Sequence, residues 1–136
     1  MRGRPSKPLP IPDHDTKPYW DGCLRGELLL QKCSECGAYR HPPSPICSVC
    51  LSASSEWVQA SGDATVYTFV VVQRAFHPAW EGEVPYIVCI VELAEGPHIM
   101  TNLTDVDPDK VHVGMPVHVW FDQASDEISL PKFRPR

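Results

Sequence analysis

Four cysteines between residues 33 and 50 form two Cys-x-x-Cys pairs, and this pattern carries the clearest chemistry in the chain. The pairs are Cys33/Cys36 and Cys47/Cys50, with ten residues between them. Each pair can make a tight turn that points two sulfurs the same way. Two such turns supply four thiolates at tetrahedral corners, about 2.3 Å from a divalent metal ion. Gly37 directly follows the first pair and can adopt the left-handed backbone that such a turn commonly needs. The spacing therefore predicts one metal ion bound by four cysteines.

The identity of the metal is less constrained than its ligands, because thiolate tetrahedra bind zinc or a single iron. The run CSECGAY at residues 33–39 is similar to the first metal-binding turn of rubredoxin, an iron electron carrier. The second turn, CSVCL at residues 47–51, lacks the glycine that rubredoxins have there, and the connecting segment is far shorter. We therefore expect structural zinc, with iron as the alternative. Four protein ligands leave no position for water or substrate, so we expect no catalytic role for the metal.

Other residue types that support catalysis form no convincing constellation. The sequence contains no Ser-His-Asp set, no glycine-rich phosphate loop and no His-Glu-x-x-His motif. Cys23 and Cys89 lie among apolar residues and are expected to be small buried side chains rather than nucleophiles. His41, beside the metal site, is expected to have a packing role. The sequence therefore favours a binding module over an enzyme.

Three groups of residues are candidates for contact with a ligand or a partner protein. They are the helix residues Tyr19 and Trp20, the loop residues Phe76, His77 and Trp80, and the basic residues Lys132, Arg134 and Arg136 near the C-terminus. Aromatic side chains on a helix suit a protein interface, and a local basic segment can meet phosphate groups. For each group, the alternative is ordinary packing or exposure to solvent.

The elements that must position these residues are mostly short strands. Residues 1–12 are rich in proline and are expected to form an extended arm. Residues 13–26 predict a short helix, with capping oxygens from Asp13, Asp15 or Thr16, Pro18 in the first turn and Gly26 at its end. Residues 27–61 predict the zinc ribbon, with strands at 27–32 and 39–41 and a third that begins at Trp57.

Residues 62–136 predict a five-stranded barrel. The expected strands are residues 63–74, 85–93, 98–103, 115–122 and 128–133, which are rich in β-branched and aromatic side chains. A long first strand that must curl, followed by four shorter strands, is typical of a Greek-key barrel of the OB type. A small open sandwich is the competing arrangement. The expected fold class is therefore mainly β: a short N-terminal helix, a rubredoxin-like zinc ribbon and an OB-type barrel.

Composition and charge exclude several classes of protein. The 136 residues suit one domain, or a small domain with a mini-domain, and 43% hydrophobic residues can build a core. A net charge of −5 and only 12 lysines and arginines argue against a nucleic-acid-binding module, the runner-up function. No apolar run approaches the ~18 residues of a membrane span, and the first residues do not resemble a signal peptide. We expect a cytoplasmic protein, where six cysteines indicate metal ligation rather than disulfides.

Several motifs together resemble one family. They are ELLLQKCSECGAYRHPPSPICSVC at residues 27–50, SGDATVYTFVVV at 61–72, VPYIVCIVEL at 84–93, GMPVHVWF at 114–121 and LPKFRP at 130–135. The pattern resembles the bacterial and archaeal family in which a rubredoxin-like zinc ribbon is joined to an OB-fold domain associated with acyl-CoA, long catalogued as a domain of unknown function. The resemblance covers residues 17–135, which leaves only the arm outside it.

The resemblance implies a non-catalytic accessory subunit. Members of the family typically accompany thiolase-fold enzymes, such as lipid-transfer-protein-like thiolases and aldolases, or acyl-CoA hydratases. They help to form the site for the coenzyme A thioester, and a similar domain pairs with an aldolase in steroid side-chain degradation. The resemblance therefore implies a hetero-oligomer with a thiolase-fold partner, and acyl-CoA as a ligand shared with that partner.

Overall fold

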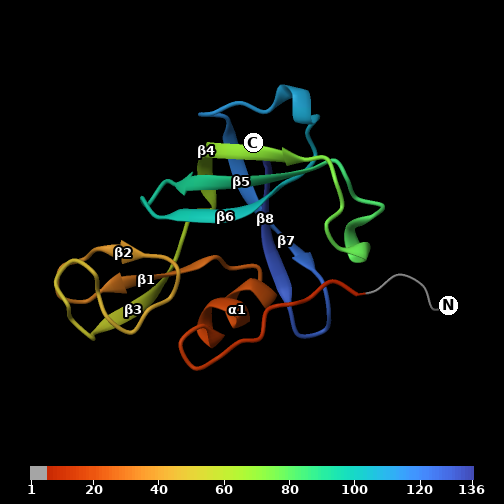
Figure 1. The fold of residues 1–136 in the computed structure, drawn as a ribbon. Coiled ribbons are helices and arrows are strands. Elements are labelled where there is room, and N and C mark those ends of the chain that lie inside the picture. Colours follow the sequence, from red (N-terminus) through yellow and green to blue (C-terminus); the bar gives the residue numbers. More distant parts are fainter. Residues whose placement is uncertain (1–5) are drawn as a thin grey trace.

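The computed structural model describes residues 6–136, and its strands form two separate sheets beside one short helix (Figure 1). The elements, in chain order, are α1 (Lys17–Leu24), β1 (Leu29–Cys33), β2 (Tyr39–Arg40), β3 (Ser55–Gln59), β4 (Asp63–Val72), the 3₁₀ turn η1 (Pro78–Trp80), β5 (Tyr86–Leu93), β6 (His98–Leu103), the 3₁₀ turn η2 (Pro108–Lys110), β7 (Pro116–Gln123) and β8 (Ser129–Pro135). The mainly β fold class is confirmed. The first five residues of the predicted arm lie outside the described residues.

Helix α1 begins at Lys17, inside the predicted range of residues 13–26, and Asp13, one of the predicted capping residues, organises the turn that leads into it. The Asp13 carboxylate accepts hydrogen bonds from the backbone N–H groups of Asp15 (3.0 Å) and Thr16 (2.9 Å), which lowers the pKa of Asp13. The Thr16 hydroxyl makes no capping bond, and Pro18 lies in the first turn as expected. Within residues 6–136, no helix has the length and apolar character needed to cross a membrane.

The first sheet is the ribbon that carries the cysteines. Its strand order is β2-β1-β3, and all pairs are antiparallel. The buried Gln31 side chain on β1 accepts a hydrogen bond of 2.7 Å from the Ser44 N–H. The Arg40 guanidinium donates to the Ser44 carbonyl at 2.7 and 3.0 Å. These bonds hold the segment between the two cysteine pairs against the sheet.

The second sheet is a closed barrel with the order β4-β5-β6-β8-β7. All neighbouring strands are antiparallel except β6 and β8, which are parallel. Strand β4 curls as predicted, because residues 63–65 pair with β7 while residues 64–72 pair with β5, and the register shifts between Val66 and Thr68. The closed barrel confirms the OB-type prediction and excludes the open sandwich.

One apolar core joins the barrel, the helix and the ribbon. Val91, Val117 and Phe133 fill the barrel at 0% exposure, and Leu28 and Leu30 continue the same cluster to the ribbon. Each such side chain contributes about 1.5–3 kcal/mol relative to exposure. Helix α1 packs against β1, β7 and β8, and Figure 1 shows it between the ribbon and the barrel. The helix therefore fixes the ribbon to the barrel.

Candidate functional site

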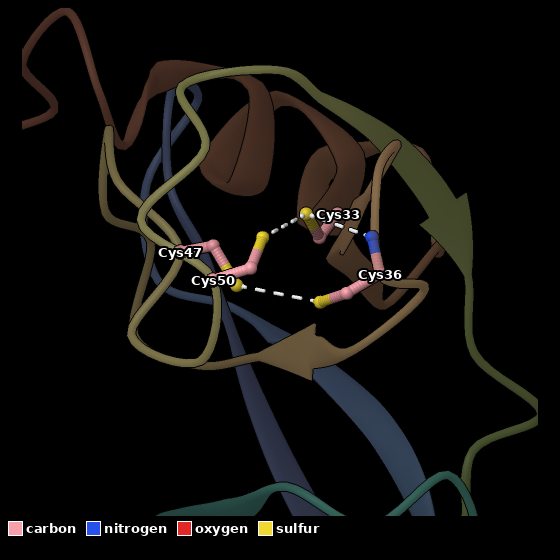
Figure 2. Close-up of side chains that lie close together, drawn as sticks. All are labelled: Cys33, Cys36, Cys47 and Cys50. Atoms are coloured by element: carbon pink, nitrogen blue, oxygen red, sulfur yellow. Dashed lines mark hydrogen bonds between the residues drawn. The ribbon is translucent and has the colours of Figure 1, made fainter.

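The four predicted cysteines converge on one point at the end of the ribbon (Figure 2). The Sγ atoms of Cys33 and Cys50 are 3.5 Å apart, those of Cys36 and Cys47 are 3.7 Å apart, and all four lie within 4.8 Å of one another. A tetrahedral ion with metal–sulfur bonds of 2.3 Å holds its sulfurs about 3.8 Å apart. The side chains therefore fit a four-thiolate metal site, as the sequence predicts.

Backbone N–H groups of the two turns point at the sulfurs. The Cys36 N–H donates to the Cys33 Sγ at 3.5 Å, and the Val49 N–H donates to the Cys47 Sγ at 3.4 Å. The contact with the Cys36 N–H lowers the pKa of Cys33 to about 6, and N–H groups of Cys50 and Val49 lower the pKa of Cys47. The pKa of Cys36 is raised, and the contact with the Cys33 sulfur raises that of Cys50 to about 12. Because a metal binds thiolates rather than thiols, binding of zinc would release the protons of these two ligands.

The two turns share one backbone geometry although their sequences differ. Gly37 follows the first pair with φ of 76°, and Leu51 follows the second with φ of 64°. The Gly37 N–H donates to the Cys33 carbonyl at 3.0 Å, and the Leu51 N–H donates to the Cys47 carbonyl at 2.9 Å. The second turn has no glycine, so Leu51 adopts the left-handed conformation there. Glycine adopts this conformation at low cost, whereas leucine does not.

The metal site is of the closed, structural kind. Zinc held by Cys33, Cys36, Cys47 and Cys50 would have four protein ligands, and its role would be to cross-link the two turns. Cys23 and Cys89 lie elsewhere, at 1% exposure, and burial raises the pKa of Cys23 to about 12 and that of Cys89 to about 11. Both are small core side chains, as predicted.

The two aromatic residues of the helix have different environments. Tyr19 is 4% exposed and belongs to the core, so it is not available as a docking side chain. Trp20 meets it edge to face, with ring centroids 5.0 Å apart, and is only partly buried. Of the predicted pair, Trp20 is therefore the one that can contact a partner.

A groove runs along the flank of the barrel from Trp20 to Trp80. It consists of three hollows of about 350, 240 and 490 Å³ that share Asn102 and Lys132 in their walls. The first hollow lies between helix α1, the ribbon residue Pro42 and strands β6 and β8, and the other two lie beside η1. We call the three together the flank groove.

The predicted loop residues point in different directions. Phe76 is 81% exposed, whereas the Trp80 ring lies in the wall of the flank groove. The His77 Nδ1 accepts a hydrogen bond of 3.0 Å from the Ala79 N–H and thereby caps η1. His77 therefore has a structural role in this loop, and Trp80 is its residue nearest to the groove.

Of the basic residues near the C-terminus, Lys132 and Arg134 belong to strand β8 rather than to a free tail, and Arg136 directly follows the strand. Strand β8 continues to Pro135 and is anchored by Phe133, which is completely buried. The Lys132 Nζ lies 2.7 Å from the Asp122 Oδ2, and the Arg136 Nη1 lies 3.1 Å from the Asp63 Oδ2. Arg134 lies over the Trp120 ring at 5.8 Å. Two of the three cations are thus already paired, and Lys132 alone of the three lines the groove.

Some polar residues are brought together only by strand pairing, and the sequence does not indicate them. Asn102 and Asp122 lie on β6 and β7 and line the groove near Lys132. His98 pairs with Glu92 at 3.0 Å, and His118 with Asp63 at 2.8 Å. No spacing along the chain indicates these contacts, because each depends on the register between strands.

Comparison with known proteins identifies both units of the chain. A family model described as "ChsH2, rubredoxin-like zinc ribbon domain" matches residues 20–56, and one described as "ChsH2, C-terminal OB-fold domain" matches residues 57–122. A solved chain named "Ltp2-ChsH2(DUF35) aldolase" is 38% identical with a TM-score of 0.86, and the match covers 93% of this chain and 98% of that one.

Curated relatives have two kinds of name. A probable enoyl-CoA hydratase alpha subunit of Thermomonospora curvata is 39% identical, and a 3-oxo-4,17-pregnadiene-20-carboxyl-CoA hydratase alpha subunit of Mycobacterium tuberculosis is 36% identical. The matches cover 95% and 82% of this chain, which spans only 40% and 35% of those proteins. A DUF35 domain-containing scaffold protein of Pyrococcus furiosus is 36% identical over 86% of this chain and 90% of its own length.

Proposed function

Because the chain belongs to the DUF35 family, in which a rubredoxin-like zinc ribbon is joined to an OB-fold domain, we propose that it is a non-catalytic subunit of a thiolase-fold enzyme that acts on coenzyme A thioesters. The observation that carries the proposal is the match, over nearly the whole chain, to the DUF35 unit named with Ltp2 in an aldolase. The scaffold name of the Pyrococcus furiosus relative supports a role without catalysis.

The names of the hydratase relatives support the class of substrate. Both are alpha subunits, and one name specifies a pregnadiene carboxyl-CoA, so a CoA thioester from steroid side-chain or lipid degradation is the proposed substrate of the complex. Acyl-CoA is then a ligand shared between the two subunits. We place the complex in the cytoplasm, where thiolates stay reduced.

The contribution of this chain to the reaction is positioning. The flank groove offers aromatic walls, Trp20 and Trp80, with Asn102 and Lys132 between them. A second subunit that completes the walls of a pocket can hold the acyl or pantetheine part of the thioester while the partner's groups act on the reacting carbons. Positioning of this kind can lower a barrier by several kcal/mol, on the order of 10²-fold or more in rate, without chemical participation.

The charge of this chain indicates which subunit contacts the phosphates of coenzyme A. The chain has a net charge of −5, and Lys132 and Arg136 are already ion-paired. Most phosphate contacts to coenzyme A are therefore assigned to the partner, and of the three basic residues near the C-terminus only Arg134, exposed beside Trp120, is not ion-paired.

The proposal is tested by co-expression of the untagged chain with a thiolase-fold protein from the same genome. The two should purify as one complex. The partner should cleave, thiolyse or hydrate its CoA thioester faster with the chain than without it, and the isolated chain should show no turnover. Partner activity that is indifferent to the chain, or turnover by the chain alone, would refute the proposal.

A further inference from the structure

A segment of this chain forms one wall of the largest hollow of the flank groove. Residues Ser6–Leu9 of the proline-rich arm form part of the wall of its largest hollow, opposite Trp80, Leu130 and Lys132. Figure 1 shows the arm, in red, passing on the side of the molecule that carries η1, in green. An extended piece of backbone therefore lies beside the same hollow as Trp80 and Lys132.

One side chain holds this segment in place. The Lys7 Nζ lies 2.6 Å from the Glu83 carboxylate and 5.6 Å from the centre of the Trp80 ring. The side chains of Lys7 and Glu83 are 35% and 41% exposed, and ion pairs with this exposure are weak because water and salt screen them. Residues 6–12 form no helix or strand with the barrel. The attachment is thus specific but easily broken.

We propose that residues 6–9 are a removable cover of the flank groove, latched by the contact of Lys7 with Glu83 and Trp80. The proposal rests on the proposed function, because removal of the arm would widen the space in which a thioester or a partner side chain can lie against Trp80 and Lys132. With the latch closed, the arm shields the apolar wall of the groove from water. With the latch open, the same wall becomes available to the ligand.

The cover is tested without any ligand by the reactivity of the Lys132 amine. Lys132 has 17% of its side chain exposed. The rate of its acetylation by acetic anhydride is measured by mass spectrometry, with Lys110 as the internal reference. Lys7→Met and Glu83→Gln should each raise the Lys132 rate roughly two- to fivefold, the range that loss of an exposed ion pair allows. The exchange variant Lys7→Glu/Glu83→Lys should restore the slow rate.

A matched control breaks another exposed ion pair away from the groove. Arg25→Gln removes the 3.1 Å pair with Glu27 and should leave the Lys132 rate unchanged. Equal Lys132 rates in wild type, Lys7→Met and Glu83→Gln would overturn the cover, as would failure of the exchange variant to slow the reaction.

A second measurement separates the cover from the proposed function. Decanoyl-CoA is titrated into wild type and Lys7→Met, and the variant should bind it roughly two- to fivefold more tightly. Equal affinities would overturn the competition between arm and ligand. Faster acetylation of Lys132 in Lys7→Met without binding of decanoyl-CoA to either protein would support the cover and count against acyl-CoA as the shared ligand.

Discussion

The imidazole ring of His41 lies 5.3 Å from the phenol ring of Tyr19, so a ribbon residue and a helix residue meet at the edge of the core. Burial lowers the pKa of His41 to about 4 and raises the pKa of Tyr19. Both side chains are therefore neutral in the folded protein at neutral pH. The contact that joins the ribbon to the helix depends on His41 staying uncharged.

We predict that acid weakens this junction through His41. The unfolded histidine titrates at about 6.5, whereas the folded one titrates at about 4. The unfolded state thus binds the proton first, so stability is lost as the pH falls below 6.5, and the loss levels off near pH 4. Between pH 7 and pH 5 the loss is roughly 2 kcal/mol in the free energy of unfolding.

Cysteine ligands of the metal also take up protons in this range, so the measurement needs a variant that removes His41 alone. Urea titrations at pH 7 and pH 5, with zinc present, are compared for wild type and His41→Gln. Wild type should lose more free energy of unfolding than the variant over this interval. Identical losses in the two proteins would show that His41 titrates normally in the folded state.

The metal centre predicts one zinc ion per chain. The four sulfurs within 4.8 Å of one another motivate this, and Cys47→Ser should abolish stoichiometric binding and unfold the ribbon. Elemental analysis gives the metal content, and amide exchange of residues 29–59 reports the ribbon. Cys89→Ala, in the barrel core, should keep its zinc. Iron in place of zinc, or full zinc content in Cys47→Ser, would be inconsistent with this prediction.

The left-handed backbone conformation of Leu51 indicates that glycine at this position would stabilise the protein. Its φ of 64° costs a non-glycine residue about 1–2 kcal/mol, whereas a new glycine adds about 0.5–1 kcal/mol of backbone entropy to the unfolded state. Its side chain is 75% exposed and contributes little packing. Leu51→Gly should therefore raise the free energy of unfolding by roughly 0.5–1 kcal/mol in the zinc-bound protein, measured by urea titration.

The first turn supplies the reverse experiment. Gly37→Ala places a side chain at the equivalent position, where φ is 76°, and should lower the free energy of unfolding by roughly 1 kcal/mol. The two substitutions should therefore change the free energy of unfolding in opposite directions. If both raised it or both lowered it, backbone strain at the residue after each cysteine pair would not explain the effects.

The sequence predicts elements well where the signal is local. The Cys-x-x-Cys spacing indicates the metal ligands because a turn of four residues determines how two sulfurs point. The β-branched run at 63–72 indicates the strand that curls around the barrel, and the structure has β4 at those residues. Each of these signals needs only neighbours along the chain.

Contacts between distant segments could not be predicted in this way. The sequence suggests a basic tail, but Lys132 pairs with Asp122 because β7 and β8 are neighbours in a register that places Phe133 in the core. Tyr19 and Trp20 look equivalent in sequence, yet the direction of the helix against the barrel buries Tyr19 and leaves Trp20 partly exposed. Burial of a side chain by another element is a tertiary effect, and helical periodicity does not report it.

Trp20 is the predicted anchor for the partner enzyme. It is partly buried at the mouth of the flank groove, and tryptophan is enriched among residues that dominate protein interfaces. Trp20→Ala should weaken the complex by about 2 kcal/mol, or roughly 30-fold in Kd, measured by calorimetric titration with the partner. The melting temperature of the isolated variant is recorded alongside, because Trp20 also packs against the core.

The control for Trp20 is an exposed apolar residue remote from the groove. Val113, on the segment before β7, is 64% exposed, and Val113→Ala should leave the affinity unchanged. An unaltered Kd for Trp20→Ala, or an equal loss for both variants, would place the docking surface elsewhere on the molecule.

Lys132 and Arg136 give the most direct test of the groove in the reaction. Lys132 lies on β8 and Arg136 directly follows it, and each is paired with an aspartate, but only Lys132 lines the flank groove. Four residues of extended chain separate them by roughly 13 Å.

If Lys132 contacts the thioester, Lys132→Met should raise the KM of the complex for its CoA thioester by about tenfold, within the range expected for loss of one charged hydrogen bond. Arg136→Met removes the same charge from the residue that follows the strand and should leave KM unchanged. Steady-state kinetics of the purified complexes measure both. Equal increases in KM would indicate a long-range effect of net charge, and no change in either would remove Lys132 from the ligand site.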